Sequence, residues 1–437
     1  MIGMKQKARD IASGLRRRVD RLAWWVCDRA ARIFVILTGK PPGKPRICIW
    51  ATALQADILA LTHALADAQE VELLVAALNV EEFLREPIQQ RKPLSCRILE
   101  RSRWQTAFAV QRFQADLAII DDQLPRYPIA PRLMYLWHGL GMWKVKPRGE
   151  ITPFVERVRS HVGDVTRANP RFLAQSYGPT TYTWWTREWG FAPECCKQLG
   201  MAYSDWLLTP PYSRAYARQA IGLPERSGPT VLLSLSWHYG SRFGVWGDLT
   251  DIAALVVKTV EPLNGQVLLC LHYRSFYDPA ALERLYTLTH EHENIYLRHK
   301  DQHPDNLADL LAADLMISNY SSFLGFFYVT GKPSIHLDPR NADGSMPRVA
   351  SYITGKREMH TIREQDVWLD SFDHHGGLAV KAPTELVQAI HTALADPACC
   401  REQSHRFLEE HVVGLDGNTG RRMGQEILAW LRPQNAQ

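Results

Sequence analysis

The sequence lacks the short signatures of several common enzyme classes. It contains no Gly-x-x-x-x-Gly-Lys-Ser/Thr loop, no Gly-x-Ser-x-Gly elbow and no His-Glu-x-x-His pair. Those motifs bind nucleotide phosphates in P-loop NTPases, expose the serine nucleophile of α/β-hydrolases and hold zinc in metalloproteases. Their absence argues against all three classes.

Cysteines are few, and long apolar runs are missing. The eight cysteines show no Cys-x-x-Cys spacing, which argues against a disulfide scaffold or a zinc knuckle and favours a reducing cytosol. No stretch approaches the roughly 18 apolar residues of a spanning helix. The apolar run at 33–37 is too short for a secretory signal. We therefore expect a cytoplasmic protein, peripheral on the inner face of the cell membrane.

Length and composition predict a globular protein of two domains. The chain has 437 residues, of which 46% are hydrophobic and 22% charged, and these values are typical of folded domains. The chain is too long for one ordinary core and suits two domains of roughly 170–200 residues.

The basic charge is concentrated at the N-terminus. Residues 1–46 contain twelve Lys or Arg against three Asp, a net charge of +9, whereas the remainder carries −4. The segment also has the spacing of an amphipathic helix, with Trp24 and Trp25 near the border between its faces. Its apolar stripe comprises Ile11, Leu15, Val19, Leu22, Val26 and Ile33.

Two interpretations of this segment follow from that pattern. A basic face, an apolar stripe and interfacial tryptophans are typical of a helix lying in a membrane surface. In that case residues 5–35 would bind an anionic membrane. The alternative is an ordinary amphipathic helix packed on the protein body.

Beyond residue 45, short apolar strands alternate with helical segments. Strands are predicted at 46–50, 71–78, 116–121, 132–137, 230–235, 266–271, 294–297, 315–317 and 333–337, and helices at 57–66, 250–260, 279–291, 305–312, 323–330, 383–395, 402–411 and 418–431. This alternation predicts parallel sheets covered by helices on both faces.

The two sets of strands predict an α/β protein of four parts. They are a basic amphipathic segment (1–45), a Rossmann-like domain (46–207), a hinge rich in proline and glycine (208–229), and a second Rossmann-like domain with C-terminal helices (230–437). We expect the two domains to face each other across a cleft. Ligands of such sheets bind beyond the carboxyl ends of the strands.

One strand end carries a polar elbow, Ser318-Asn319-Tyr320-Ser321-Ser322, which opens a short apolar helix. Free backbone N–H groups at a helix N-terminus, together with two hydroxyls, favour binding of an anion such as phosphate. The alternative is a serine that caps a buried helix.

Two further strand ends carry histidines. His138 is followed by Gly139 and, downstream, by Lys144, so its imidazole is uncrowded and suited to a general base. His272 and Arg274 follow another strand and could hold phosphate oxygens. The alternatives are a histidine bonded to a backbone carbonyl and a structural Arg–carboxylate pair.

These loops, in this order, resemble the CDP-glycerol glycerophosphotransferase family of teichoic-acid and capsule polymerases. The resemblance spans most of 46–432 and rests on short segments: Trp137-His138-Gly139 with Lys144, Leu199 to Asp205, Val231 to Trp237, His272, Asp314 to Ser322 with Gly331-Lys332-Pro333, and Asp416-Gly417. The chain differs from the family pattern at Leu140, Tyr273, Asn319 and Phe326, where the family has Thr, Pro, Asp and an acidic residue.

The resemblance implies a GT-B-like fold, with an acceptor domain first and a nucleotide-donor domain second. It implies transfer of a polyol phosphate from a CDP-activated donor to a hydroxyl of a cell-surface glycan or lipid-linked acceptor, with release of CMP. His138 and His272 would be catalytic, Arg274, Asn319, Ser321 and Ser322 would bind the donor diphosphate, and Gly139 and Lys144 would support them.

On this interpretation no metal, cofactor or nucleic acid is expected. Two alternatives remain open. One is a GT-B glycosyltransferase that uses a nucleotide sugar in cell-envelope polysaccharide synthesis. The other is a non-catalytic relative that binds a surface polymer.

Overall fold

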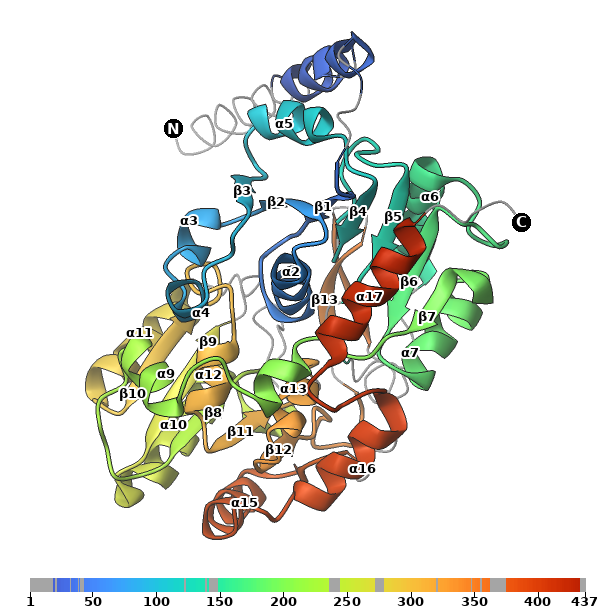
Figure 1. Cartoon of the computed structure of the whole chain (residues 1–437). Helices are drawn as coiled ribbons and strands as arrows, with labels where there is room; N and C mark the ends of the chain where they lie inside the picture. The colour runs from blue at the N-terminus through green and yellow to red at the C-terminus, as the bar shows by residue number, and fades with distance from the viewer. Residues whose placement is uncertain are drawn as a thin grey trace, which may run out of the picture.

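The computed structural model describes most of the chain. The described residues are 19, 22–31, 33–37, 39, 43–121, 123–137, 140, 148–235, 244–271, 279–319, 321–346, 348–353, 356–361 and 375–432. Two parallel sheets dominate them (Figure 1).

The first sheet is built from the predicted N-terminal set of strands. Its elements are β1 (Arg46–Trp50), α2 (Ala56–Ala68), β2 (Glu72–Ala77), α3 (Val80–Phe83), α4 (Pro87–Arg91), β3 (Arg97–Glu100), α5 (Gln105–Phe113), β4 (Leu117–Ile120), β5 (Arg132–Tyr135), α6 (Arg148–Val162), β6 (Phe172–Ser176), α7 (Pro179–Thr183), η1 (Trp184–Glu188), η2 (Pro193–Cys195) and β7 (Cys196–Gln198). The strand order is β3-β2-β1-β4-β5-β6-β7.

The second sheet repeats this order. Its elements are α8 (Ser204–Leu208), α9 (Arg214–Ala220), β8 (Thr230–Leu233), η3 (Gly244–Trp246), α10 (Leu249–Val260), η4 (Glu261–Leu263), β9 (Gln266–Leu271), α11 (Pro279–Glu291), β10 (Ile295–His299), α12 (Leu307–Ala312), β11 (Leu315–Ser318), α13 (Phe323–Val329), β12 (Ser334–Leu337), the hairpin β13 (Arg348–Ile353) and β14 (Lys356–Thr361), β15 (Leu378–Val380), α15 (Pro383–Ala395), α16 (Arg401–His411) and α17 (Thr419–Leu431). The strand order is β10-β9-β8-β11-β12-β15.

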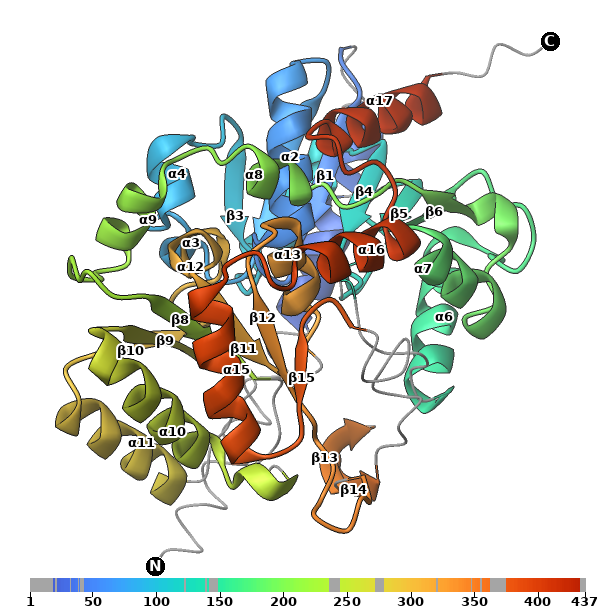
Figure 2. The same ribbon diagram turned by 90° about the horizontal axis from the view of Figure 1, so that it is seen from below.

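Both orders are those of doubly wound Rossmann-type sheets, as predicted. The central strands are apolar along their length because helices cover both faces. In β1, Ile47, Cys48 and Ile49 are fully buried, and Ile49 pairs with Val75 on one side and Ile119 on the other. Figure 2 shows α10, α11 and α15 lying along the second sheet, where they contact its strands.

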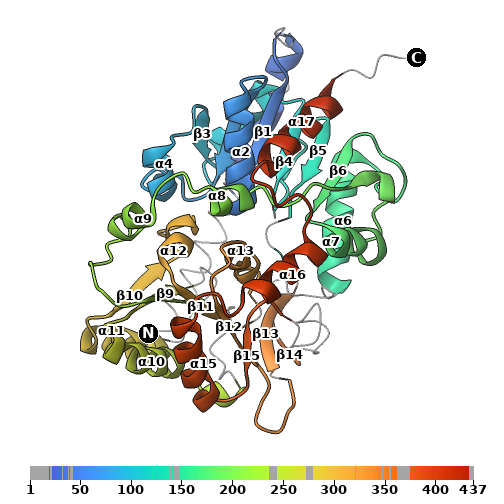
Figure 3. The same ribbon diagram turned by 60° about the horizontal axis from the view of Figure 1, so that its bottom comes forward.

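The C-terminal helices return toward the first sheet (Figure 3). Helix α17 packs on α2, and Arg132 donates a hydrogen bond to the carbonyl of Trp430 at 2.6 Å. Lys197 and Glu426 form an ion pair at 2.6 Å. The sequence pattern predicted α17 as a helix but did not predict its contact with the first half of the chain.

Helical residues 22–31 and 33–37 lie against α5 (Figure 1). Their inner face is Cys27, Asp28 and Ala31, and Gln111 donates to the Asp28 carboxylate at 2.7 Å. The predicted apolar stripe faces outward: Val19, Leu22, Val26 and Ile33 are 48–62% exposed. The helix therefore packs on the protein body, as the second interpretation expected, but through Cys27, Asp28 and Ala31 and not through these four residues of the stripe. Ile11 and Leu15 lie outside the described residues. In the part of the chain that the structure describes, no helix is both long and apolar enough to cross a bilayer.

Candidate functional site

The predicted polar elbow joins β11 to α13. Asn319 is fully buried and Ser321 and Ser322 are half-buried. The first amides of the helix are satisfied locally: Phe323 N–H donates to the Ser321 hydroxyl at 3.3 Å, and the next two amides donate to the carbonyls of Ser321 and Ser322 at 3.1 and 3.2 Å. The expectation that these amides are free for an anion is wrong, because the tight turn uses them. The Ser322 hydroxyl makes no hydrogen bond to any described residue.

The other predicted site residues fall outside the described part of the chain. These are His138, Gly139, Lys144, His272 and Arg274. The described residues next to them show which strand ends they follow. Trp137 and Leu140 stand on either side of His138 and Gly139 in the sequence, and Leu271 precedes His272. Strands β9 and β11 lie on either side of β8, so their carboxyl ends share one edge about 10 Å apart.

An aromatic cluster supports the segment that ends at Trp137. The rings of Trp137 and Trp185 meet edge to face at 4.9 Å, and those of Trp185 and Trp189 do so at 4.7 Å. Gln175 accepts from the Trp137 amide at 2.9 Å and donates to the Gly200 carbonyl at 2.6 Å. These large buried rings, together with the two Gln175 hydrogen bonds, hold the backbone of Trp137 in one position.

Asp57, in the first turn of α2, lies beneath the same segment. Its carboxylate accepts from the Tyr177 hydroxyl and, at 2.8 Å, from the Tyr203 amide. Tyr177 lies 3.2 Å from the Trp137 carbonyl. Burial raises the pKa of Asp57 to about 7, although the two hydrogen bonds oppose this rise. No cation is among these partners, and so the neutral acid is favoured.

Tyr203 connects this network to the second sheet. Its ring meets Phe326 edge to face at 5.2 Å, and its hydroxyl donates to Asp305 at 2.9 Å. Burial, and then repulsion by Glu86, raise the pKa of Asp305 to about 6. Phe326, at the position where the family has an acidic residue, is therefore part of the contact between the two halves.

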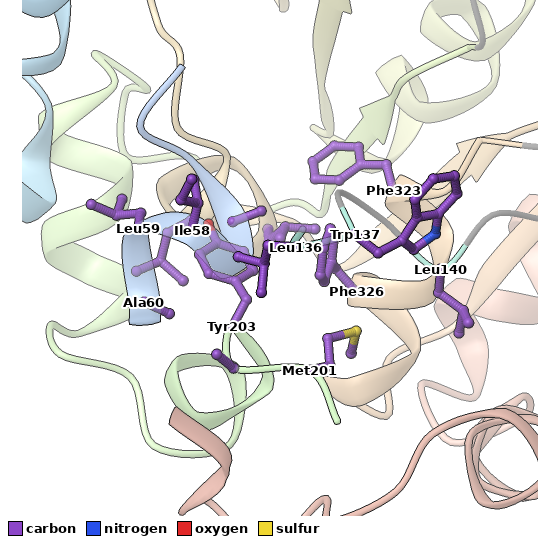
Figure 4. Close-up of a cluster of buried hydrophobic side chains, with 14 of the residues drawn as sticks. Ile58, Leu59, Ala60, Leu136, Trp137, Leu140, Met201, Tyr203, Phe323 and Phe326 are labelled. Atoms are coloured by element: carbon purple, nitrogen blue, oxygen red, sulfur yellow. The ribbon is translucent and has the colours of Figure 1, made fainter. Parts of the chain in front are cut away.

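Leu140 completes this contact. It is fully buried, and a methyl group built on Gly325 of α13 would lie 2.7 Å from its Cβ. Figure 4 shows Leu140 and Trp137 beside Phe323 and Phe326, with Tyr203 and Met201 in the same cluster. The structure thus brings together the segment that contains His138 and the helix that follows Ser322.

Three of the family-like segments join elements of the fold. The Asp205 carboxylate accepts from the amides of Thr419 and Gly420 at 2.9 and 2.8 Å, which caps α17. The Lys332 ammonium donates to the carbonyls of Leu311 and Ala313 at 3.2 and 2.7 Å, and burial lowers its pKa to about 8. Segment 199–205 therefore joins the first half to α17, and segment 331–333 joins elements within the second half. In segment 416–417, Asp416 pairs with Arg422 of α17 at 2.6 Å. Short motifs did not reveal these roles.

The fold and this junction define a two-domain, GT-B-like α/β architecture, in which two Rossmann-type sheets meet at their carboxyl edges. No protein-family model matches the sequence, and no curated protein matches it.

Among solved structures, the chain is similar to the wall teichoic acid polymerase TagF, with a TM-score of 0.63, 13% identity and 100% of both chains covered. A TagF variant soaked with CDPG gives a TM-score of 0.64 over 94% of this chain and 95% of that one, at 13% identity. A putative UDP-N-acetylglucosamine 2-epimerase from Listeria monocytogenes gives 0.53 at 12% identity over 90% and 98%. The predicted resemblance to the CDP-glycerol glycerophosphotransferases is confirmed for the fold, and the chain is divergent in sequence from TagF.

Proposed function

We propose that the chain is a transferase that moves a polyol phosphate, such as glycerol phosphate, from a CDP-activated donor to a hydroxyl of a cell-surface glycan or lipid-linked acceptor. The observation that carries the proposal is the junction at Leu140 and Gly325. There the segment containing His138 meets the helix that follows Ser322, within the fold of TagF.

In the proposed reaction, His138 takes the proton of the acceptor hydroxyl. The hydroxyl oxygen forms a bond to the phosphorus of the polyol phosphate. The bond from that phosphorus to the bridging oxygen breaks, and CMP leaves with the electron pair. His272 and Arg274 stabilise the charge that develops on the diphosphate.

The elbow forms the rest of the proposed donor site. Among the described residues the Ser322 hydroxyl has no hydrogen-bond partner, whereas the Ser321 hydroxyl accepts from the Phe323 amide. Asn319, buried directly after β11, would bind the donor diphosphate with the two serines. Gly139 leaves room beside His138, and Lys144 adds positive charge near the donor.

A substitution at His138 tests the assignment of the base. His138→Ala should lower CMP release from CDP-glycerol by about 10²–10⁴-fold, with native membranes of the source organism supplying the acceptor. Thermal unfolding should be unchanged. His405→Ala, at a surface histidine whose side chain is 72% exposed, is the matched control and should retain full turnover. Turnover of His138→Ala close to the wild-type value would exclude His138 as the base.

Donor binding is tested separately by thermal stabilisation. At 100 times its Kd, a ligand stabilises a protein by about 2.7 kcal/mol. CDP-glycerol should stabilise the wild-type chain, and Ser322→Ala should weaken this effect. Equal stabilisation of both proteins would remove Ser322 from the donor site.

A nucleotide-sugar transferase is the second candidate, and the environment of Phe326 favours keeping it. The residue at this position is a phenylalanine that packs on Tyr203, so it offers no carboxylate to a donor. Stabilisation by UDP- or GDP-sugars, with no response to CDP-glycerol, would select this candidate. A chain stabilised by none of these nucleotides would favour a non-catalytic polymer-binding protein.

We also propose that the N-terminal helix binds an anionic membrane surface and brings the enzyme to a lipid-linked acceptor. The outward face combines the exposed side chains of Leu22, Trp25, Val26 and Ile36 with the basic charge of the segment. Apolar side chains enter the headgroup region, and each nearby Lys or Arg adds about 1 kcal/mol.

Vesicle sedimentation tests this membrane contact. Phosphatidylglycerol vesicles should bind the wild-type chain more tightly than phosphatidylcholine vesicles do. Leu22→Glu together with Val26→Glu should reduce that binding at least tenfold. Leu84→Glu, at an exposed leucine elsewhere, is the control and should not change it. Binding that the double substitution leaves intact would refute the proposal.

A further inference from the structure

Helix α13 contains a glycine where helix propensity disfavours one. Gly325 is the third residue of this seven-residue helix and is buried. Glycine destabilises a helix interior relative to alanine, so packing around this position must be considered. Here Leu140 of the first half, on the opposite side of the junction, rests directly on the Gly325 backbone.

The fit leaves no room for a methyl group. A Cβ on Gly325 would lie 2.7 Å from Cβ, 3.1 Å from Cδ2 and 3.3 Å from Cγ of Leu140. Carbon atoms in contact are about 3.5–4.0 Å apart. Because the nearest atom is Cβ and not the flexible end of the side chain, an added methyl would displace the Leu140 backbone by about 1 Å.

We propose that Leu140 and Gly325 are positioning residues that set the distance between the acceptor-activating segment and the donor elbow. This inference rests on the proposed function. Leu140 is joined to His138 through Gly139 alone, and Gly325 follows Ser322 by three residues. A displacement of Leu140 is therefore transmitted to the proposed base, whereas the elbow keeps its own contacts within the second half.

The expected consequence is a loss of turnover without a loss of donor binding. Misplacing reacting groups by about 1 Å can reduce a rate by 10²-fold. The residues proposed to bind the donor diphosphate, Arg274, Asn319, Ser321 and Ser322, all belong to the second half, so donor affinity should not change. Substitution of a residue that served only the stability of the core would not lower turnover while leaving donor binding unchanged.

The experiment compares Gly325→Ala, Leu140→Gly and the double variant with Gly424→Ala. Gly424 lies inside α17, where an added Cβ would meet Leu65 Cδ2 at an ordinary 3.6 Å, so it is a matched helix-glycine control. CMP release from CDP-glycerol with native membranes gives kcat and KM. The shift in Tm caused by CDP-glycerol reports donor binding.

Gly325→Ala should lower kcat at least tenfold and change the donor KM and the CDP-glycerol shift less than twofold. Gly424→Ala should match the wild type. In the Leu140→Gly background, adding Gly325→Ala should change kcat less than twofold, since the clashing Cβ is gone. Leu140→Ala, which removes the branched end of the side chain that rests on Gly325, should lower kcat at least fivefold and leave donor binding unchanged. This variant replaces Gly325→Ala in the test if Gly325→Ala does not fold.

Wild-type kcat in Gly325→Ala or in Leu140→Ala would overturn the positioning role. So would a tenfold effect of Gly325→Ala that persists in the Leu140→Gly background. A wild-type chain that releases no nucleotide from any tested donor would overturn the proposed function, and the positioning role with it. Release by the wild type, with an unaffected Gly325→Ala variant, would overturn the positioning role alone.

Discussion

Two buried aspartates, one in each half of the molecule, are stabilised in opposite ways. Asp309 of α12 accepts from Arg298 at 2.9 Å and from Lys300 at 2.5 Å, whereas Asp57 of α2 is surrounded by neutral donors. Burial alone would raise the pKa of both carboxyls. At Asp309 the charges of Lys300 and Arg298 outweigh burial and lower the pKa, but at Asp57 burial prevails.

This difference separates two uses of a buried carboxyl. Asp309 is held as an anion and joins β10 to α12 through opposite charges. Asp57, with a pKa of about 7, is about half protonated at pH 7. It connects Tyr177, Tyr203 and, through Tyr177, the Trp137 carbonyl. The charged cluster should therefore tolerate loss of one member poorly, and the neutral network should respond mainly to pH.

The largest effect is expected from Asp309→Asn. This change leaves two buried cations without a counter-charge, which costs about 3–5 kcal/mol. The Tm of the transition assigned to the second half should fall by roughly 6–20 °C in scanning calorimetry. The loss should shrink as the pH falls below about 4, because the unfolded wild-type carboxyl then gains a proton whereas the folded carboxyl, whose pKa is lowered, stays ionised.

An exposed ion pair provides the control for Asp309→Asn. Glu81 and Arg85 form a pair at 2.7 Å with side chains 78% and 71% exposed. Glu81→Gln should change the free energy of unfolding by less than about 0.5 kcal/mol. Similar losses in both variants would show that burial does not distinguish these pairs.

A smaller, pH-dependent effect is expected from Asp57→Asn. The folded pKa of about 7 lies above the ordinary value, so this carboxyl contributes stability at low pH that is lost as the pH rises through 7. Between pH 5 and pH 8 the wild type should lose roughly 2–3 kcal/mol from this group. The asparagine variant lacks this loss, so its stability relative to the wild type should rise over that range. Denaturation curves at both pH values measure the change, and a pH-independent difference would contradict it.

Local patterns predicted the central strands and the longer helices of the second half well, but they missed strands such as β3, β7 and β15 and predicted contacts poorly. The bounds of β9, α11 and α15 agree with the prediction, because each is a compact apolar or amphipathic run with clear end signals. Strand β6 was not predicted: its Gln175 and Ser176 are polar yet fully buried, and their hydrogen-bond partners are remote in the sequence.

The candidate site shows the same limit. The residue types at Ser321 and Ser322 predicted the polar elbow. Whether the amides that follow donate hydrogen bonds within the turn depends on the turn geometry, which residue types do not give. Asp57 meets Tyr177 and Tyr203 across 120 and 146 residues, and Leu140 meets Gly325 across 185. Such contacts arise from the packing of two sheets, which no local periodicity encodes.

The smallest effect is expected from Tyr177→Phe, which tests whether neutral donors alone stabilise the Asp57 network. Removing the hydroxyl takes one donor from the carboxylate and should raise the pKa of Asp57 further, since that hydrogen bond lowers it. The cost should be about 1 kcal/mol near pH 5 and greater near pH 8, because a hydrogen bond to a charged acceptor is the stronger one. Tyr182→Phe, at a half-buried tyrosine in the same helix region, is the control and should show no such pH dependence. If Tyr177→Phe cost more at pH 5 than at pH 8, Asp57 would not be the acceptor that matters, and the contrast with Asp309 would have to rest on packing alone.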